Sequence, residues 1–267
     1  MDDSIQIVKD NYDSGALREW ERLEHHPFEL EITRHMMDKY IKPGDKILDI
    51  GGGPGRYSIH YAKKGCVVTL FDLSSECVKF AQQKADEEGV RINAISGDAR
   101  FVADLVDGEF DHVLLMGPLY HLVEKADRRI AVESAMKRLK KGGNLYASFI
   151  MIFAGMIYAM KNEPELLLRE SEQIFIESAL NDTSISGDAF TKAHFTTVSD
   201  MKSFMGEFPL EKLHIFGQEG ITAPCERNIL AQPAEVVQRW LEIACRTCER
   251  EDLLSLSEHA MYIGRKM

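Results

Sequence analysis

Apolar and polar residues follow a repeating pattern through the middle of the chain. Five strand-like runs occur at residues 46–50, 66–71, 91–95, 111–116 and 144–150. The helical stretches between them include residues 57–64, 75–88 and 125–140, and the pair Gly142-Gly143 is expected to end the last of these helices. Repeated strand–helix units of this length predict a parallel sheet with helices on both faces.

The pattern changes on either side of this region. Residues 1–42 are charged and helix-prone, with one apolar stripe formed by Leu17, Trp20 and Leu23. After residue 151 the alternation ends, and strand candidates return only at 211–216 and 260–265. We therefore predict an N-terminal helical leader at 1–42 and a main domain at 43–267, with helical cap insertions at about 151–200 and 217–258.

Length and charge limit the choice of partner. A chain of 267 residues that is 45% hydrophobic can bury one substantial core. Its 43 acidic and 32 basic residues give a net charge of -11, which repels phosphate backbones, so we expect no nucleic-acid partner. The first ten residues lack a basic segment followed by an apolar core, and we expect a cytoplasmic protein.

An uncharged run and a pair of cysteines bear on whether the chain has a membrane span or a metal site. The uncharged run at 145–160 is shorter than the roughly 20 residues of a spanning helix, so it is interpreted as a buried strand followed by a helix, and no membrane partner is expected. The five cysteines are an odd number and predict reduced thiols. Cys245 and Cys248 have CxxC spacing but no second pair, so no metal site is predicted.

A glycine-rich loop carries the clearest chemical signal. It follows the strand at 46–50 and contains Gly51, Gly53 and Gly55, small residues that let the backbone approach a ligand. A dinucleotide-binding loop would need a glycine at position 56, which is Arg56, and the Gly-Lys-Ser/Thr ending of a phosphate-binding loop is also missing. What remains is Asp-x-Gly-x-Gly-x-Gly, beginning at Asp49, which we expect to order the loop by accepting backbone N–H groups.

This pattern resembles the first motif of the class I S-adenosylmethionine-dependent methyltransferases, and the resemblance covers residues 45–150 well. It implies a Rossmann-like, doubly wound α/β fold with a seven-stranded sheet, mostly parallel with an antiparallel last strand. Asp72, at the end of the second strand, would then grip both ribose hydroxyls of the cofactor S-adenosylmethionine, because two carboxylate oxygens match two hydroxyl donors. Asp98, after the third strand, would accept from the adenine amino group.

The resemblance implies a set of residues in contact with the cofactor. Tyr12 has two interpretations, because its hydroxyl can close over the amino-acid end of the cofactor or its ring can simply lie on the surface. The full set is Tyr12, Gly51, Gly53, Gly55, Asp72, Leu73, Asp98, Ala99 and Met116.

The turn after the fourth strand should face the methyl acceptor, because ligands of open α/β sheets bind beyond the carboxyl ends of the strands. It reads Gly-Pro-Leu-Tyr-His-Leu from Gly117 to Leu122, which is similar to a bacterial group of small-molecule methyltransferases. The Asn/Asp-Pro-Pro-aromatic turn of base-methylating relatives is missing. Tyr120 and His121 are the acid–base candidates, although methyl transfer needs alignment more than proton transfer and a base is optional.

The sequence leaves several alternatives open. The favoured function is methyl transfer by direct displacement to a small-molecule acceptor, whose reacting atom can be O, N, C or S. A protein or RNA methyltransferase and a non-catalytic cofactor-binding sensor or partner protein are the alternatives. Of the other histidines, His25 and His26 are interpreted as solvated loop residues, His194 lies on a segment that could return towards the pocket, and His259 is interpreted as a structural hydrogen-bonding residue.

Overall fold

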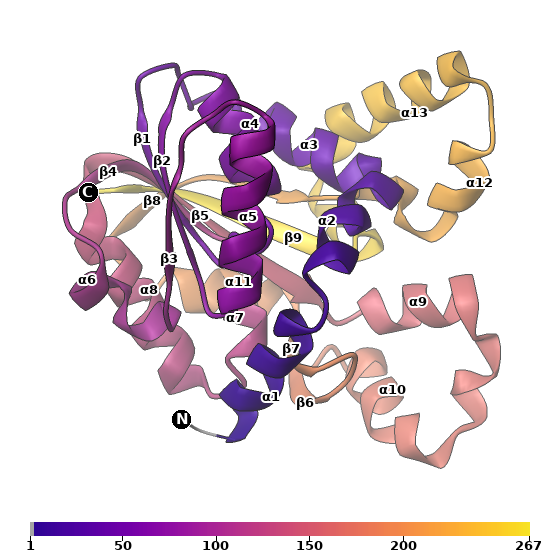
Figure 1. Ribbon diagram of the computed structural model, residues 1–267. Coiled ribbons are helices and arrows are strands. Elements are labelled where there is room, and N and C mark those ends of the chain that lie inside the picture. The colour runs from indigo at the N-terminus through magenta and orange to yellow at the C-terminus, as the bar shows by residue number, and fades with distance from the viewer. Residues whose placement is uncertain (1–2) are drawn as a thin grey trace.

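The computed structural model describes residues 3–267, and its centre is one nine-stranded sheet (Figure 1). The strands are β1 (Lys46–Ile50), β2 (Val67–Asp72), β3 (Asn93–Ser96), β4 (Phe110–Leu115), β5 (Leu139–Met151), β6 (Ile185–Asp188), β7 (Lys192–Thr196), β8 (Leu210–Gly217) and β9 (His259–Lys266). All five strands predicted between residues 46 and 150 are present, with shifts of up to five residues at their ends.

Most of the sheet is parallel. The order β3-β2-β1-β4-β5 is parallel throughout, and β9 lies antiparallel between β5 and β8. The carboxyl ends of the parallel strands therefore meet at one edge, where the glycine loop begins. The predicted doubly wound α/β class and its antiparallel last strand are both observed.

The expected number of seven strands is wrong, because the sheet contains an additional hairpin formed by β6 and β7. β7 pairs in parallel with the carboxyl end of β5, through Ile150 and Met151, and β6 pairs antiparallel with β7. These strands have only four and five residues, and β6 is largely exposed. Such short strands lack the long alternation of apolar and polar residues from which a strand is predicted.

Helices cover both faces of the sheet and form two apolar cores. The first core contains side chains from α1 (Asp3–Asp13), α6 (Val102–Leu105), α8 (Lys125–Arg138) and α11 (Val198–Met205). The second contains side chains from α2 (Ala16–His25), α3 (Pro27–Met37), α4 (Arg56–Lys63) and α13 (Ala234–Thr247). Helix α5 (Ser75–Glu87) packs against β2, β3 and α4. The leader thus contributes helices to both faces.

The glycine pair Gly142-Gly143 does not end a helix, contrary to expectation. Helix α8 ends at Arg138, and Leu139 already pairs with Phe110 of β4 as the first residue of β5. The pairing register shifts between Phe110 and His112, and Gly142 has a positive φ of 78°. The glycines therefore bend the beginning of a strand, a role that glycine also takes in irregular sheet positions.

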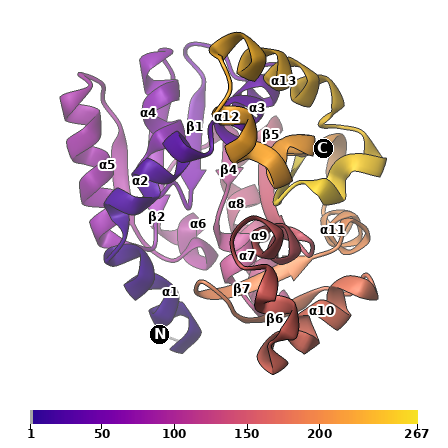
Figure 2. The ribbon, with the colours of Figure 1, turned by 90° about the vertical axis from the view of Figure 1, so that its right-hand side faces the viewer.

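Two helical segments project beside the sheet (Figures 1 and 2). One follows β5 and contains α9 (Ala154–Asn162), two short 3₁₀ helices (Pro164–Leu168 and Glu170–Glu172) and α10 (Gln173–Leu180). The other follows β8 and contains a 3₁₀ helix (Gly220–Cys225), α12 (Glu226–Leu230), α13 and a 3₁₀ helix (Glu251–Leu256). Across residues 3–267, no helix combines the length and apolar character that crossing a membrane requires.

Candidate active site

A cavity opens at the carboxyl ends of β1, β2 and β4. The N-terminal helices α1 and α2 lie over this edge of the sheet (Figure 2). The cavity brings together residues from the glycine loop, from three strand ends, from the leader and from the start of β9. Its lining includes Tyr12, Glu19, Arg22, Leu23, Glu29, Asp49, Gly51, Gly53, Tyr57, Asp72, Leu73, Asp98, Ala99, Met116, Tyr120, His121, Ser148, Gln218 and His259.

The glycine loop has a backbone that other residues would strain. Gly51 and Gly53 have φ angles of 77° and 52°, in the left-handed region that favours glycine. A Cβ atom on Gly51 would lie 2.5 Å from Cδ of Pro118, so the loop packs directly against the turn after β4. Both glycines line the cavity, whereas Gly55 precedes α4 as its N-cap residue and does not.

Asp72 is held at the end of β2 by two backbone donors. Its Oδ1 accepts from the backbone N–H of Ser74 and its Oδ2 from that of Gly53, both at 2.8 Å. Burial raises the pKa of Asp72 to about 6, although these two bonds oppose the shift. The carboxylate is thus fixed relative to the glycine loop. Leu73 follows it on the cavity wall.

Asp98 reaches the cavity but has a strong partner of its own. The guanidinium of Arg100 donates to both carboxylate oxygens, with Nη2 2.6 Å from Oδ2, and the backbone N–H of Arg100 donates to Oδ1. Arg100 also forms an ion pair with Asp127. An adenine amino group would therefore compete with Arg100 for the lone pairs of Asp98. The neighbouring Ala99 is buried and lines the cavity.

Asp49 is bound by a side-chain donor and not by the backbone donors that were expected. It is buried, and its Oδ2 accepts from the hydroxyl of Ser58 on α4 at 2.7 Å, in place of the backbone N–H groups expected. Burial raises the pKa of Asp49 to about 7. The acid therefore ties the loop to the following helix through a side chain, because α4 turns Ser58 back towards β1.

Tyr12 and His121 form a hydrogen-bonded pair, and both line the cavity. The Tyr12 hydroxyl lies 2.7 Å from Nε2 of His121, and Nδ1 of His121 lies 3.0 Å from the backbone carbonyl oxygen of Lys192. Because the carbonyl can only accept, Nδ1 carries the proton and Nε2 accepts from Tyr12. Burial lowers the pKa of His121 to about 4, so the ring is neutral at physiological pH.

Tyr120 stands between two histidines. Its ring centroid is 4.8 Å from that of His121 and 5.9 Å from that of His259. Burial raises the pKa of Tyr120, so its hydroxyl stays protonated. The two predicted acid–base candidates therefore lie together on the cavity wall, and Met116 lines the same wall at the end of β4.

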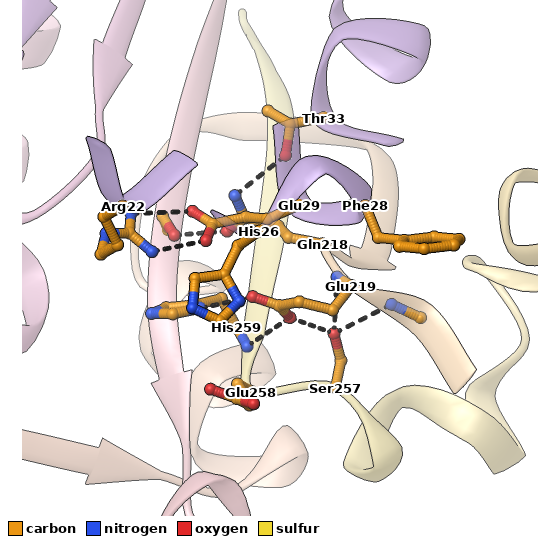
Figure 3. A network of polar contacts seen from close by, with 12 residues as sticks. Arg22, His26, Phe28, Glu29, Thr33, Gln218, Glu219, Ser257, Glu258 and His259 are labelled. Carbon is orange, nitrogen blue, oxygen red and sulfur yellow. Dashed lines mark hydrogen bonds and ion pairs between the residues drawn. The ribbon is translucent and has the colours of Figure 1, made fainter. Parts of the chain in front are cut away.

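Sequence reasoning missed a network of charged residues on the leader side of the cavity (Figure 3). Arg22 on α2 donates to both oxygens of Glu29 on α3, at 2.6 and 3.1 Å, and its Nε lies 3.3 Å from Glu19. Glu29 is only 5% exposed. Alternating charge at 19, 22 and 29 was a weak signal, because the same spacing is common on solvated helix faces.

His259 was expected to be structural, and its hydrogen bonds to Glu219 agree with that, but it also lines the cavity. Its Nδ1 lies 2.6 Å from Oε1 of Glu219, whose Oε2 accepts from the His259 backbone N–H at 2.9 Å and from the Ser257 hydroxyl at 2.6 Å (Figure 3). Burial alone would lower the pKa of His259, but the charge and hydrogen bond of Glu219 raise it to about 9.

Glu29, Glu219 and His259 have the spacing of a metal site, with one potential ligand atom of each lying within 4.8 Å of the others. The carboxylates of this group already accept hydrogen bonds from neighbouring donors. Glu29 is held by the guanidinium of Arg22, and Glu219 accepts three hydrogen bonds from Ser257 and His259. A cation would have to displace these donors, so the arrangement gives no reason to revise the prediction of a site without metal.

The remaining histidines and cysteines lie away from the chemistry. His25 is exposed as expected, but His26 is not a simple solvated residue, because its Nδ1 lies 2.6 Å from Oε2 of the buried Glu226, 200 positions later. The bond with Glu226 raises the pKa of His26. His194 is hydrogen-bonded to Ser186 on the β6–β7 hairpin and does not line the cavity. All five cysteines are free thiols.

Comparison with known proteins agrees with this geometry. Residues 47–143, which contain the glycine loop, Asp72, Asp98 and the turn after β4, match the family model described as a methyltransferase domain. The solved structure of magnesium protoporphyrin IX methyltransferase from Synechocystis with bound S-adenosylhomocysteine has a similar fold, with a TM-score of 0.59 and 15% identity, covering 99% of this chain and all of that chain. Residues 47–143 thus match a methyltransferase domain, and the similarity to the solved structure extends over the fold of the whole chain.

Two relatives are similar to a smaller part of the chain. A ubiquinone biosynthesis O-methyltransferase from Erwinia tasmaniensis is 31% identical over 129 residues, which are 45% of this chain and 52% of that protein. A putative ribosomal RNA large subunit methyltransferase from Methanocaldococcus jannaschii is 35% identical over 111 residues, 39% of this chain and 28% of that protein. The chain thus spans about half the length of the first relative.

Proposed function

We propose that the protein transfers the methyl group of S-adenosylmethionine to a small-molecule acceptor by direct displacement. The single observation that carries this proposal is one cavity whose lining includes the glycine loop and Asp72 together with Tyr120, His121 and residues of the leader helices. One end offers the contacts expected for a nucleoside, and the other offers a polar, largely buried wall for a second molecule. Displacement needs the two molecules to be aligned, which binding in a single cavity would achieve.

The cofactor end rests on Asp72 and the glycine loop. The two oxygens of Asp72 keep lone pairs beyond those used by Gly53 and Ser74, so they can accept from two ribose hydroxyls. Gly51 and Gly53 leave room for the ligand beside the backbone. Bound S-adenosylmethionine would supply a methyl group on a positively charged sulfur, and several acidic side chains around the cavity favour that charge.

The acceptor end favours a small molecule over a nucleic acid. It is covered by α1 and α2, and its walls include buried side chains such as Leu23 and His121. The net charge of -11 disfavours an RNA substrate, even though one relative is named for ribosomal RNA. The relatives named as ubiquinone biosynthesis O-methyltransferases support a small acceptor that carries oxygen.

His121 is the residue that we propose for proton transfer where the acceptor must lose a proton. It is neutral, and its Nε2 holds a lone pair that the Tyr12 hydroxyl occupies in this structure. A low pKa makes it a carrier that passes the proton on to solvent and not a strong base. Tyr120 would fix the orientation of the acceptor with a hydroxyl that stays protonated.

The test is an acceptor screen with methyl-labelled S-adenosylmethionine. Pools of small phenols, carboxylic acids, amines and thiols are compared with ribosomal RNA and with unfolded protein, and the labelled product is identified by mass. We expect label in a small molecule. Label only in RNA or protein would contradict the proposal in favour of those alternatives, and a protein that binds the cofactor but labels nothing would favour the sensor.

A further inference from the structure

Two histidines with opposite charge states face the same cavity. His121 lies on α7 (Pro118–His121) and His259 begins β9, and the ring of Tyr120 stands near both. His121 is neutral because it is buried without a charged partner, and its Nδ1 donates to a carbonyl oxygen. His259 has a carboxylate as its partner. Paired groups whose surroundings separate their charge states often divide the chemical roles of a site.

Glu219 fixes the direction of the His259 ring. It is 3% exposed, and its two oxygens accept from Nδ1 of His259, from the His259 backbone and from Ser257. The ring therefore cannot turn about without losing a short bond in a buried place. Within residues 3–267, the other ring nitrogen, Nε2, has no hydrogen-bond partner, and the ring lies on the cavity wall. A protonated His259 consequently offers one unused N–H donor to a ligand.

The other charges around His259 come from two elements of the leader. Glu29 on α3 favours the protonated form and Arg22 on α2 opposes it. These two side chains are bound to each other through two hydrogen bonds, and Glu19 lies 3.3 Å from Arg22, so these three leader residues add no net positive charge beside His259. The pair His259–Glu219 is likewise neutral as a whole, but only its positive end reaches the cavity lining. At this point of the lining, Nε2–H of a protonated His259 is therefore the donor that can form a charge-assisted hydrogen bond with an anion.

We propose that Nε2–H of His259, held by Glu219, binds the acceptor through an oxyanion, so that the acceptor is a small molecule with an acidic hydroxyl or a carboxyl group. This inference rests on the proposed function and narrows its acceptor class. An ammonium group would be repelled at this position, and a neutral alcohol would gain little from a charged donor. His259 is therefore a specificity-determining residue that selects the charge of the acceptor.

The transfer balances without a further reactant. An acidic acceptor releases its proton to solvent as it binds, since the imidazolium stabilises the anion. A lone pair of that oxygen forms the new bond to the methyl carbon, the carbon–sulfur bond breaks, and its electron pair stays on sulfur as a neutral thioether. The product is a neutral ether or ester. It has lost the charge that His259 holds, so the product leaves more readily than the acceptor does.

The role predicts an effect on binding and not on the chemical step. The oxyanion has its full charge before transfer and loses it during transfer, so His259 stabilises the bound acceptor more than the transition state. For an acidic acceptor, His259→Gln should raise KM about tenfold or more, with kcat unchanged or slightly raised. In His259→Gln, the pH at which kcat/KM falls on the acid side should also shift from its wild-type position towards the pKa of the free acceptor.

The experiment uses the whole chain saturated with S-adenosylhomocysteine and 4-nitrocatechol as the probe, because its absorption spectrum distinguishes phenol from phenolate. The wild type should bind the phenolate, with the apparent pKa of the probe lowered by about one unit, a tenfold change in its acid constant. His259→Gln should abolish the shift, and Glu219→Gln should reduce it. Benzoate should compete with the probe and benzylamine should not. His194→Gln, outside the cavity, should behave as the wild type.

Four results would overturn the inference: a bound probe in the phenol form, an unchanged shift in His259→Gln, stronger competition by benzylamine than by benzoate, or a wild type that binds S-adenosylhomocysteine but neither anion. If His259→Gln no longer binds S-adenosylhomocysteine, Ser257→Ala replaces it. That variant keeps the histidine but removes one bond to Glu219, and it should reduce the shift. Failure of the wild type to bind S-adenosylhomocysteine would instead contradict the proposed function itself.

Discussion

The hydroxyl of Tyr12 lies 2.7 Å from Nε2 of His121, which joins the first helix of the chain to the turn after β4. The residue after Tyr12 makes a second link, because Asp13 accepts a 2.6 Å hydrogen bond from the hydroxyl of Ser74 at the beginning of α5. Helix α1 is thus attached to two strand ends of the cofactor-binding region. The leader is part of the site and not a separate appendage.

Replacing Tyr12 by phenylalanine should therefore weaken cofactor binding. One hydrogen bond is worth about 0.5–1.5 kcal/mol, so the dissociation constant of S-adenosylhomocysteine should rise about 3- to 10-fold. Isothermal calorimetry measures this directly. Tyr158→Phe is the matched control, since the hydroxyl of Tyr158 is exposed and bonds only to Glu163. Equal affinities of Tyr12→Phe and the wild type would show that α1 does not contribute to the cofactor site.

Gly51 should tolerate alanine poorly. The new Cβ would lie 2.5 Å from Cδ of Pro118 and 2.7 Å from the carbonyl oxygen of Met116, and the φ of 77° strains any residue with a side chain. We expect Gly51→Ala to lower the free energy of unfolding by about 2 kcal/mol or more. Gly44→Ala has a similar backbone strain but meets nothing within 4 Å, so it isolates the steric part. Urea denaturation measures the free energy of unfolding of both variants. If both lose the same amount, the loop is not tightly packed on the turn.

The free energy of unfolding should depend on pH through the pair His259–Glu219. The pKa of His259 is raised from 6.5 to about 9, so its contribution is complete below pH 6.5 and is lost as the pH rises through 9. The pKa of Glu219 is lowered, so its contribution is present above the unfolded value near 4.5 and is lost in acid. The free energy of unfolding of the wild type should be higher than that of His259→Gln at pH 6. This advantage should be about 1–3 kcal/mol smaller at pH 9.5. A difference between the two proteins that is constant with pH would contradict the charged pair.

Local pattern was enough to predict that Asp72 and the glycine loop meet at one edge of the sheet. Asp72 follows an apolar run that can only be a strand, and the glycine loop follows another, so the parallel topology brings them to one edge. The same reasoning failed at Gly142-Gly143, because a glycine pair after a helical stretch also suits the bend at the beginning of a strand. Which of these roles the glycines take depends on the pairing of Leu139 with β4, a contact that sequence alone does not give.

The acceptor half could not be predicted in the same way. Glu219 and His259 are 40 positions apart, and Glu29 and Arg22 come from the leader, almost 200 positions earlier. No motif spans such distances, and each residue alone has an ordinary structural or solvated interpretation. They meet only because β9 lies beside β5 and because α2 and α3 fold over the sheet. The division of the chain into leader, main domain and cap insertions stays an interpretation.

The most direct test of the account is the binding of S-adenosylhomocysteine to Asp72→Asn, measured by calorimetry. Asp72 is fixed by the backbone of Gly53 and Ser74 and should accept from the ribose. Losing the charge should weaken binding about 10- to 100-fold, because hydrogen bonds to charged groups contribute about 1.5–3 kcal/mol. Asp86→Asn, on the exposed face of α5, should bind as the wild type does. Equal affinity of Asp72→Asn and the wild type, or no binding by the wild type, would contradict the account.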